Sequence, residues 1–283
     1  RRLMEEVEDF PLQYFYDVRE SIVRIRVENT HLEEDELFDL RRSLSTIDGI
    51  VKILNHSDDD EAEQEDGWRR EKKYPYPALH RLSADVMSFP QLVQRIDQIL
   101  DKFGKIRDNA TPELLQIRRE LAKTEGSISR TLYGILRAAQ SEGVVEKDVT
   151  PTLRDGRLVI PVIPTLKRKI KGIVHDESAT GRTVFIEPTE VVEANNRVRE
   201  LEGEERKEII RILTDFTNKV RPFSHEILDS YRFLAIIDLI QAKAKLAETQ
   251  QAIEPEVEAH PHVDWTRAIH PLLRLSLEKK GEK

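Results

Sequence analysis

Apolar residues recur at steps of three and four along most of this chain, which is the spacing of one face of an α-helix. The run "LEEDELFDLRRSLSTIDGIVKIL", residues 32–54, shows it clearly. Its apolar positions are Leu37, Leu40, Leu44, Ile47, Val51 and Leu54. This pattern predicts an amphipathic helix, and we expect residues 1–110 to form a helical core. Seven acids crowd residues 57–67 of that core, and they predict a solvated loop.

A long helix is predicted to begin at Pro112. Thr111 suits the N-cap position and Pro112 the first helical position, because that position needs no backbone N–H donor. Apolar positions then follow at Leu114, Ile117, Leu121, Ile128, Leu132, Ile135 and Ala139. Gly143 is expected to end the helix.

A second helix of similar length is predicted after Pro188, with Thr189 as its cap, and Pro222 is expected to kink or break it. Its packed seam is predicted at Ile209, Leu213, Phe216 and Val220, continuing through Phe223, Ile227 and Leu234. Residues 199–208 hold one apolar residue, Leu201, so we expect an exposed shaft there.

The β-branched runs of the chain lie between these two helices. They are "GRLVIPVIP" (156–164), "KGIVHD" (171–176) and "TVFIEP" (183–188), and Gly156 and "ESATGR" mark the turns between strands. Two helices that flank one small sheet predict an antiparallel two-helix lever with the sheet at its tip.

Composition narrows the class of protein. Charged residues make up 35% and aromatic residues 6% of 283 residues, which favours long solvated helices. The net charge of −8 argues against a generally basic nucleic-acid coat, and the absence of cysteine excludes disulfides and thiolate metal sites.

The longest apolar run, "FLAIIDLI" at 233–240, is too short to span a bilayer and no signal peptide is visible, so we expect a cytoplasmic protein without a membrane partner. Because the chain begins at Arg1, we also expect it to be a piece of a longer protein.

Basic residues gather in residues 151–182. This segment holds seven lysine or arginine residues and three acidic residues, so its net charge is 7 − 3 = +4, although the whole chain is acidic. They are Arg154, Arg157, Lys167, Arg168, Lys169, Lys171 and Arg182. Cations spaced along a hairpin can follow a phosphate backbone without reading bases, so we predict that these residues bind DNA. The alternative is a solvated turn kept polar for solubility.

Two enzyme hypotheses arise from "HDES" and both fail on geometry. His175, Asp176 and Ser178 are the residue types of a catalytic triad, and His175, Asp176 and Glu177 those of a metal site. Adjacent side chains on an extended strand point to opposite faces, so neither set can converge. We therefore expect no catalytic residue, no metal and no cofactor in this chain. His175 is expected to be a hairpin residue that adds a phosphate contact when protonated.

Three quoted runs carry a resemblance to a known family. "TLRDGRLVIPV", "KGIVHDESATGRTVFIEP" and "VVEANNRVRELEGEE" resemble the clamp and lever of the MutS superfamily, specifically its bacterial type-two branch. Weaker similarity covers "LEEDELFDLRRSL", "ELLQIRREL" and "IHPLL". The resemblance implies a mainly α fold: an elongated helical core with an antiparallel lever that carries a small antiparallel β clamp. Its segments would be the core (1–110), the ascending lever helix (111–148), the clamp (149–188), the descending lever helix (189–250) and a linker to an absent ATPase domain (251–283).

The resemblance also implies a function. The clamp would grip double-stranded or branched DNA non-specifically, in DNA mismatch repair or suppression of recombination, within a homodimer of the full-length protein. ATP and Mg²⁺ would bind the full-length protein only, because no G-x-x-x-x-G-K-[ST] loop occurs in this chain. The small nuclease domain of type-two members is absent as well, so the fragment itself is not expected to be an enzyme, whereas its parent would be a DNA-dependent ATPase.

Two alternatives stay open at this level. The basic tip could serve ribosomal RNA, since some type-two lineages act on collided ribosomes, or the chain could be a helical scaffold that docks other proteins. Mismatch readers of the superfamily use a Phe-x-Glu motif, and Phe185 and Glu187 have that spacing. In those proteins, however, the motif belongs to a separate N-terminal domain, and we predict that Phe185 packs the sheet.

Overall fold

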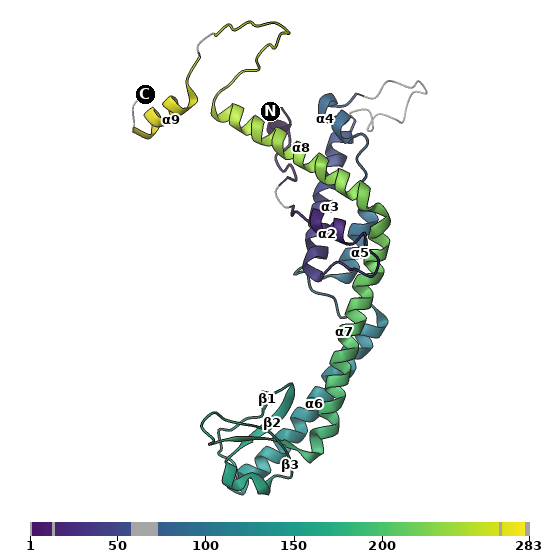
Figure 1. Ribbon diagram of the computed structural model, residues 1–283, viewed down its shortest axis with the longest axis vertical. Helices are drawn as coiled ribbons and strands as arrows, with labels where there is room; N and C mark the ends of the chain where they lie inside the picture. The colour runs from purple at the N-terminus through teal and green to yellow at the C-terminus, as the bar shows by residue number, and fades with distance from the viewer. Residues whose placement is uncertain (1, 13–14, 58–72, 266–267, 281–283) are drawn as a thin grey trace. The chain divides into compact units, whose positions relative to one another are not determined.

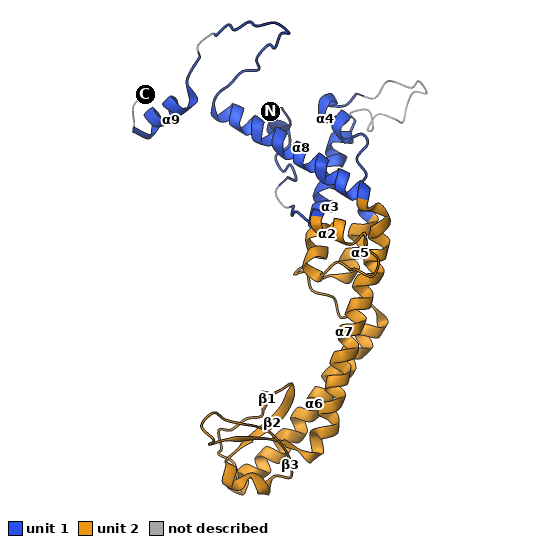
Figure 2. Cartoon of the chain, in the orientation of Figure 1, with its two compact units in different colours: residues 1–19, 42–90, 225–283 blue, residues 20–41, 91–224 orange. Residues whose placement is uncertain are grey.

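The protein is mainly helical and holds one small antiparallel sheet, as the sequence predicted (Figure 1). The computed structural model describes residues 2–12, 15–57, 73–265 and 268–280. The chain divides into two compact units, one of residues 1–19, 42–90 and 225–283 and the other of residues 20–41 and 91–224 (Figure 2). Among the described residues, no helix is long and apolar enough to cross a membrane.

The first unit is built from helices. It contains α1 (Arg2–Glu6), α4 (Pro77–Ser83), α9 (Pro271–Lys280), nearly all of α8 (Ser224–Thr249) and the later turns of α3 (Glu34–Asn55). The six apolar positions predicted for residues 32–54 are all buried, so this helix prediction is confirmed. The predicted acidic loop at 57–67 lies outside the described residues except for Ser57. The predicted linker at 251–283 contains α9.

The second unit holds the candidate site. It contains the start of α3, nearly all of α2 (Arg19–Arg24) and α5 (Pro90–Ile99), and the long helices α6 (Pro112–Ser141) and α7 (Val192–Val220). The start of α6 is as predicted, because the Thr111 hydroxyl accepts a hydrogen bond from the Leu114 N–H at 3.1 Å. The helix ends two residues before Gly143, whose φ of +73° allows the left-handed turn that follows.

The helix that begins as α7 differs from its prediction at its start, whereas its break at Pro222 is as predicted. Thr189 does not cap it: a 3-10 turn, Thr189–Val191, comes first, and the Thr189 N–H donates to the Lys171 carbonyl at 3.1 Å. At the other end Pro222 sits in a 3-10 turn, Arg221–Phe223, and α8 starts directly after it. Because a 3-10 turn rotates 120° per residue, Phe223 leaves the predicted seam and is 40% exposed.

Helices α6 and α7 run antiparallel. Glu113 pairs with Arg211 at 3.8 Å, whereas Glu120, seven residues further along α6, pairs with Arg197 at 2.9 Å, earlier in α7. The sheet lies at one end of this pair (Figure 1). Its strands are β1 (Thr152–Arg154), β2 (Arg157–Val162), β3 (Gly172–Glu177) and β4 (Val184–Pro188), in the order β1-β2-β4-β3.

Strand β1 was not predicted from the sequence, since it has only three residues. It pairs with β2 through a two-residue turn at Asp155 and Gly156, which have φ of +48° and +71°. Positive φ at both central positions is the geometry of a type I′ hairpin, and Gly156 is the residue that signalled this turn.

One face of the sheet packs on α6. Side chains of β2 and β4 meet α6 residues in a single buried cluster, and Ile160, Ile186 and Leu132 are among its members. The segment 163–171 crosses from the end of β2 to the start of β3 and contains a 3-10 turn, Pro164–Lys169. Ile170 is buried in the same cluster and Leu166 packs against it, so the crossover is anchored by apolar side chains.

Candidate nucleic-acid interface

Five of the seven predicted cations lie on the connections of the sheet. Lys167, Arg168 and Lys169 end the 3-10 turn of the crossover, Lys171 precedes β3, and Arg182 lies in the β3–β4 turn. All five are exposed. None of them forms an ion pair with any residue that the structure describes. Their charge is therefore available to a ligand in solution.

The other two predicted cations are engaged within the sheet. The Arg154 guanidinium lies over the Phe185 ring, 4.2 Å from its centroid, and 4.0 Å from the Asp176 carboxylate. Arg157 donates to Glu187 and to the Asn196 side-chain oxygen, both at 2.7 Å, and its side chain is 15% exposed. These two arginines help to build the sheet, and their contact with a ligand remains a prediction.

A β-bulge at His175 changes the expected alternation of β3. Val174 pairs with Ile186 and Asp176 pairs with Phe185, so His175 is an extra residue whose backbone has no pairing partner on β4. The imidazole Nε2 of His175 hydrogen-bonds the Glu187 carboxylate. The assumption of strict alternation through "VHDE" was wrong at this point, because a bulge lets one residue turn away from the regular pattern.

The carboxylate of Glu187 is the centre of a buried polar cluster. It has no exposed surface and receives hydrogen bonds from β2, β3 and α7, through Arg157, His175 and Asn195, the last at 2.8 Å. Burial alone would raise the pKa of Glu187, but the hydrogen bonds from His175, Asn195 and Arg157 outweigh burial and lower that pKa. Glu187 is therefore kept ionised, and its hydrogen bonds connect the sheet to α7.

The side chains considered for a triad have separate partners. Ser178 accepts from the Thr183 N–H at 3.0 Å and so closes the β3–β4 turn. Asp176 accepts from the Glu177 N–H at 2.8 Å, while His175 contacts Glu187. No group of three metal-ligating side chains that could hold an ion occurs among the residues that are described.

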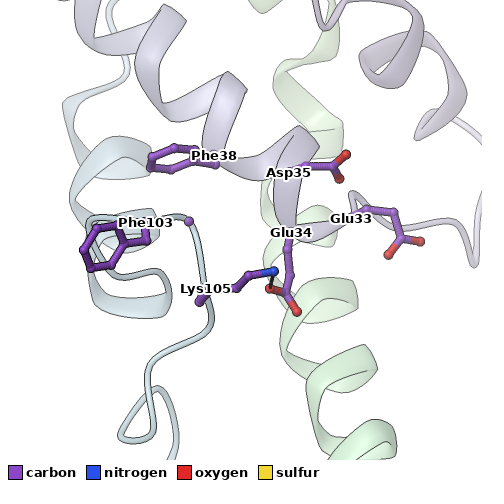
Figure 3. A pocket seen from close by; sticks show the side chains of 7 residues that line it. Glu33, Glu34, Asp35, Phe38, Phe103 and Lys105 are labelled. Atoms are coloured by element: carbon purple, nitrogen blue, oxygen red, sulfur yellow. Dashed lines mark ion pairs between the residues drawn. The ribbon is translucent and has the colours of Figure 1, made fainter.

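A hollow in the same unit has the opposite charge. It is lined by the acids Glu33, Glu34 and Asp35 at the start of α3, with Phe38, Phe103, Gly104 and Lys105 (Figure 3). Lys105 lies 3.9 Å from Glu34, and Glu33 lies 3.2 Å from His31, so three acids and one lysine line the hollow. Such a surface repels phosphate, so we do not assign the hollow to nucleic acid.

The Glu187 cluster was not found from the sequence. A weak signal existed, because Arg157 and Glu187 are charged residues within β-branched runs whose neighbours are apolar. A charge in such a place is usually paired when it is buried. The partner on α7, Asn195, gave no local sign of its role, since it comes from a helix that only the tertiary fold brings against the sheet.

Comparison with known proteins places this chain in context. No family model matches it. It is 34% identical over 263 residues to a protein named Endonuclease MutS2 from Latilactobacillus sakei, covering 93% of this chain and 32% of that relative. Proteins of the same name from Levilactobacillus brevis and Symbiobacterium thermophilum are 36% and 32% identical, over 93% and 97% of this chain. The chain spans about a third (32%) of the length of these curated relatives.

Proposed function

This chain belongs to the MutS2-type branch of the MutS superfamily, and on that premise we propose that it is the DNA-gripping part of a longer protein. In this proposal, helices α6 and α7 are the lever and the sheet is the clamp. The clamp binds duplex or branched DNA through phosphate groups without reading the base sequence. The role of the full-length protein is then DNA repair or suppression of recombination in the cytoplasm.

The observation that carries the proposal is the set of five exposed, unpaired cations around the sheet. The backbone of Lys167, Arg168 and Lys169 is held in place, because Leu166 and Ile170 anchor the crossover on either side of them. A backbone that is already ordered loses little further conformational freedom on binding. Phosphate contacts position a protein on nucleic acid without selecting a sequence. This favours a non-specific grip.

The rest of the parent protein enters only by proposal. The relatives are about three times as long as the matched segment, since it covers 32% of each. We place the binding of ATP and Mg²⁺ and any nuclease activity outside this chain, in the part that the relatives have beyond the match. The full-length protein is proposed to be a homodimer.

Salt-dependent binding to a duplex of random sequence tests the grip. The test variant changes Lys167, Arg168, Lys169 and Lys171 to Gln. For every phosphate group that the variant no longer binds, the slope of log affinity against log salt concentration should fall by about 0.9. We expect weaker binding to all sequences alike, with an unchanged circular dichroism spectrum.

A matched control removes the same charge from the helix pair. Arg119, Lys123, Arg206 and Lys207 are exposed and have no ion pair with any described residue, so changing them to Gln alters net charge equally. This control should keep most of the duplex affinity. Equal weakening in both variants would mean that only net charge matters, and unchanged affinity in the test variant would overturn the assignment of the clamp.

RNA is tested in the same assay. Phosphate contacts serve both nucleic acids, whereas A-form helices are recognised by shape and 2′-hydroxyl contacts. Tighter binding to structured RNA than to duplex DNA at equal salt, abolished in the same test variant, would favour a ribosomal RNA target over DNA. Binding to neither would favour a helical scaffold for other proteins.

A further inference from the structure

The middle of the α6–α7 pair lacks a buried apolar seam. Every residue of both helices is described, and in α6 no residue from 115 to 127 is buried, between Leu114 and Ile128. In α7, Glu208 is the one buried residue between Leu201 and Ile212. We call these stretches, 115–127 and 202–211, the shaft. Buried apolar side chains lie at both of its ends, at Leu114 and Ile128 of α6 and at Leu201 and Ile212 of α7, and none lies within it.

Ion pairs hold the shaft together. Arg118 contacts Glu205 at 2.7 Å within it, and Glu120 of the shaft contacts Arg197, which precedes the shaft in α7, at 2.9 Å. These are long, partly exposed side chains. Interdigitated apolar side chains resist a change of angle between helices, whereas long charged side chains can keep contact while the backbones shift. The shaft is thus the part of the pair where bending disrupts least packing.

Each helix also carries a glycine within the shaft that packing does not require. A Cβ added to Gly126 would meet no atom within 4 Å, and a Cβ added to Gly203 would meet only the Arg206 guanidinium at 3.9 Å. Neither residue has the positive φ that favours glycine. Glycine in a helix interior is less stable than alanine, because it leaves the backbone more freedom.

From the polar contacts and the two glycines together, we infer that the shaft is a built-in bending joint. It lets the sheet change its angle relative to the far end of the same helix pair, where Leu213 and Phe216 are buried. The inference does not depend on nucleic-acid binding, and it concerns one unit of the chain only.

Spin-label distance measurements on the 283-residue chain test the joint. The sequence has no cysteine, so labels attach only where a cysteine is introduced. We choose the exposed residues Arg137 and Lys219, which lie beyond opposite ends of the shaft, for substitution by Cys. We expect a broad distribution of distances. It should narrow when Gly126→Ala and Gly203→Ala are combined, and amide exchange within the shaft should slow about fivefold per glycine.

Gly134 supplies the matched control. It lies in α6 with no atom within 4 Å of an added Cβ, but its neighbours Leu132 and Leu136 are buried against the sheet. Gly134→Ala should stabilise the helix without narrowing the distances across the shaft. A distribution that is already narrow in the unmodified chain, or one that Gly134→Ala narrows as much as the double variant does, would overturn the inference. Amide exchange on the unlabelled chain provides a second measurement. If the backbone amides of the shaft exchange as slowly as those of the packed helix ends, the inference of a bending joint is wrong.

Discussion

Arg157 on β2 donates to the carboxylate of Glu187 on β4 at 2.7 Å, and that carboxylate has no exposed surface. Asn195 of α7 donates to the same oxygen at 2.8 Å. One buried side chain therefore joins two strands of the sheet to the first turn of the helix that follows it. An ionised group in this position is stable only while its donors remain in place.

Replacing Glu187 should destabilise the sheet strongly. Glu187→Ala leaves the Arg157 guanidinium and the Asn195 amide without their acceptor, and breaking a buried ion pair typically costs about 3–5 kcal/mol. The free energy of unfolding from denaturant titration measures the destabilisation, and amide exchange in β2 and β4 locates it. Glu187→Gln keeps the shape and part of the hydrogen bonding, so its destabilisation should be smaller. If Glu187→Ala lowers the free energy of unfolding by only about 0–1 kcal/mol, as loss of an exposed ion pair does, the buried carboxylate does not stabilise the sheet as described.

The same glutamate should make stability depend on pH in the acid range. Its pKa is lowered in the folded protein from the ordinary value of 4.5. The unfolded chain therefore takes up a proton first as pH falls below 4.5, and the stabilisation from the ionised group is lost progressively as pH approaches the folded pKa.

Glu187→Gln removes this titration, so the variant's unfolding free energy should fall less steeply than that of the unmodified chain below pH 4.5. Thermal melts at a series of acid pH values give the two slopes. Glu193→Gln, at an exposed position of α7, is the control for a change of net charge. If the unfolding free energy depends on pH equally steeply in Glu187→Gln and in the unmodified chain, the titration of Glu187 does not contribute to the loss of stability in acid.

The helices could be predicted because their signals are local. Thr111 and Pro112 mark the start of α6, and the apolar stripe of residues 32–54 is buried as predicted. Capping and helical periodicity involve residues within four positions of one another, so one sequence contains the whole signal. The predicted cations were also found exposed where they lie on connections between strands, because such connections lie at the surface.

The features that the sequence could not predict depend on distant parts of the chain. The bulge at His175 is defined only against β4, and the burial of Glu187 needs Asn195 from α7. Arg157 was grouped with the free cations because its charge was visible, whereas its partner on β4, thirty residues away in sequence, was not. Whether a charge is free or paired is decided by tertiary contacts.

Gly172 should tolerate no side chain. A Cβ at this position would lie 2.1 Å from the Glu187 carbonyl oxygen and 2.8 Å from its carbonyl carbon, both backbone atoms that cannot move aside. Gly172→Ala must therefore push β3 away from β4, with an expected destabilisation of about 1–3 kcal/mol. Amide exchange in β3 should accelerate. Gly134→Ala, which meets no atom within 4 Å, is the matched control and should be at least as stable as the unmodified chain. If the amides of β3 exchange in Gly172→Ala at the same rate as in the unmodified chain, β3 and β4 lie further apart than described.

Phe185 should pack the sheet and not read mismatches. The residue is 6% exposed, and the Arg154 guanidinium lies over its ring, 4.2 Å from the centroid. A residue that wedges between bases must be free to leave its own fold, and removing this ring from under Arg154 would forfeit a cation–π interaction of about 0.5–2 kcal/mol. Phe185→Leu should lower the melting temperature while leaving the ratio of affinities for mismatched and matched duplexes unchanged in competition binding. A mismatch preference that disappears in Phe185→Leu, with matched-duplex affinity intact, would instead make Phe185 the reader.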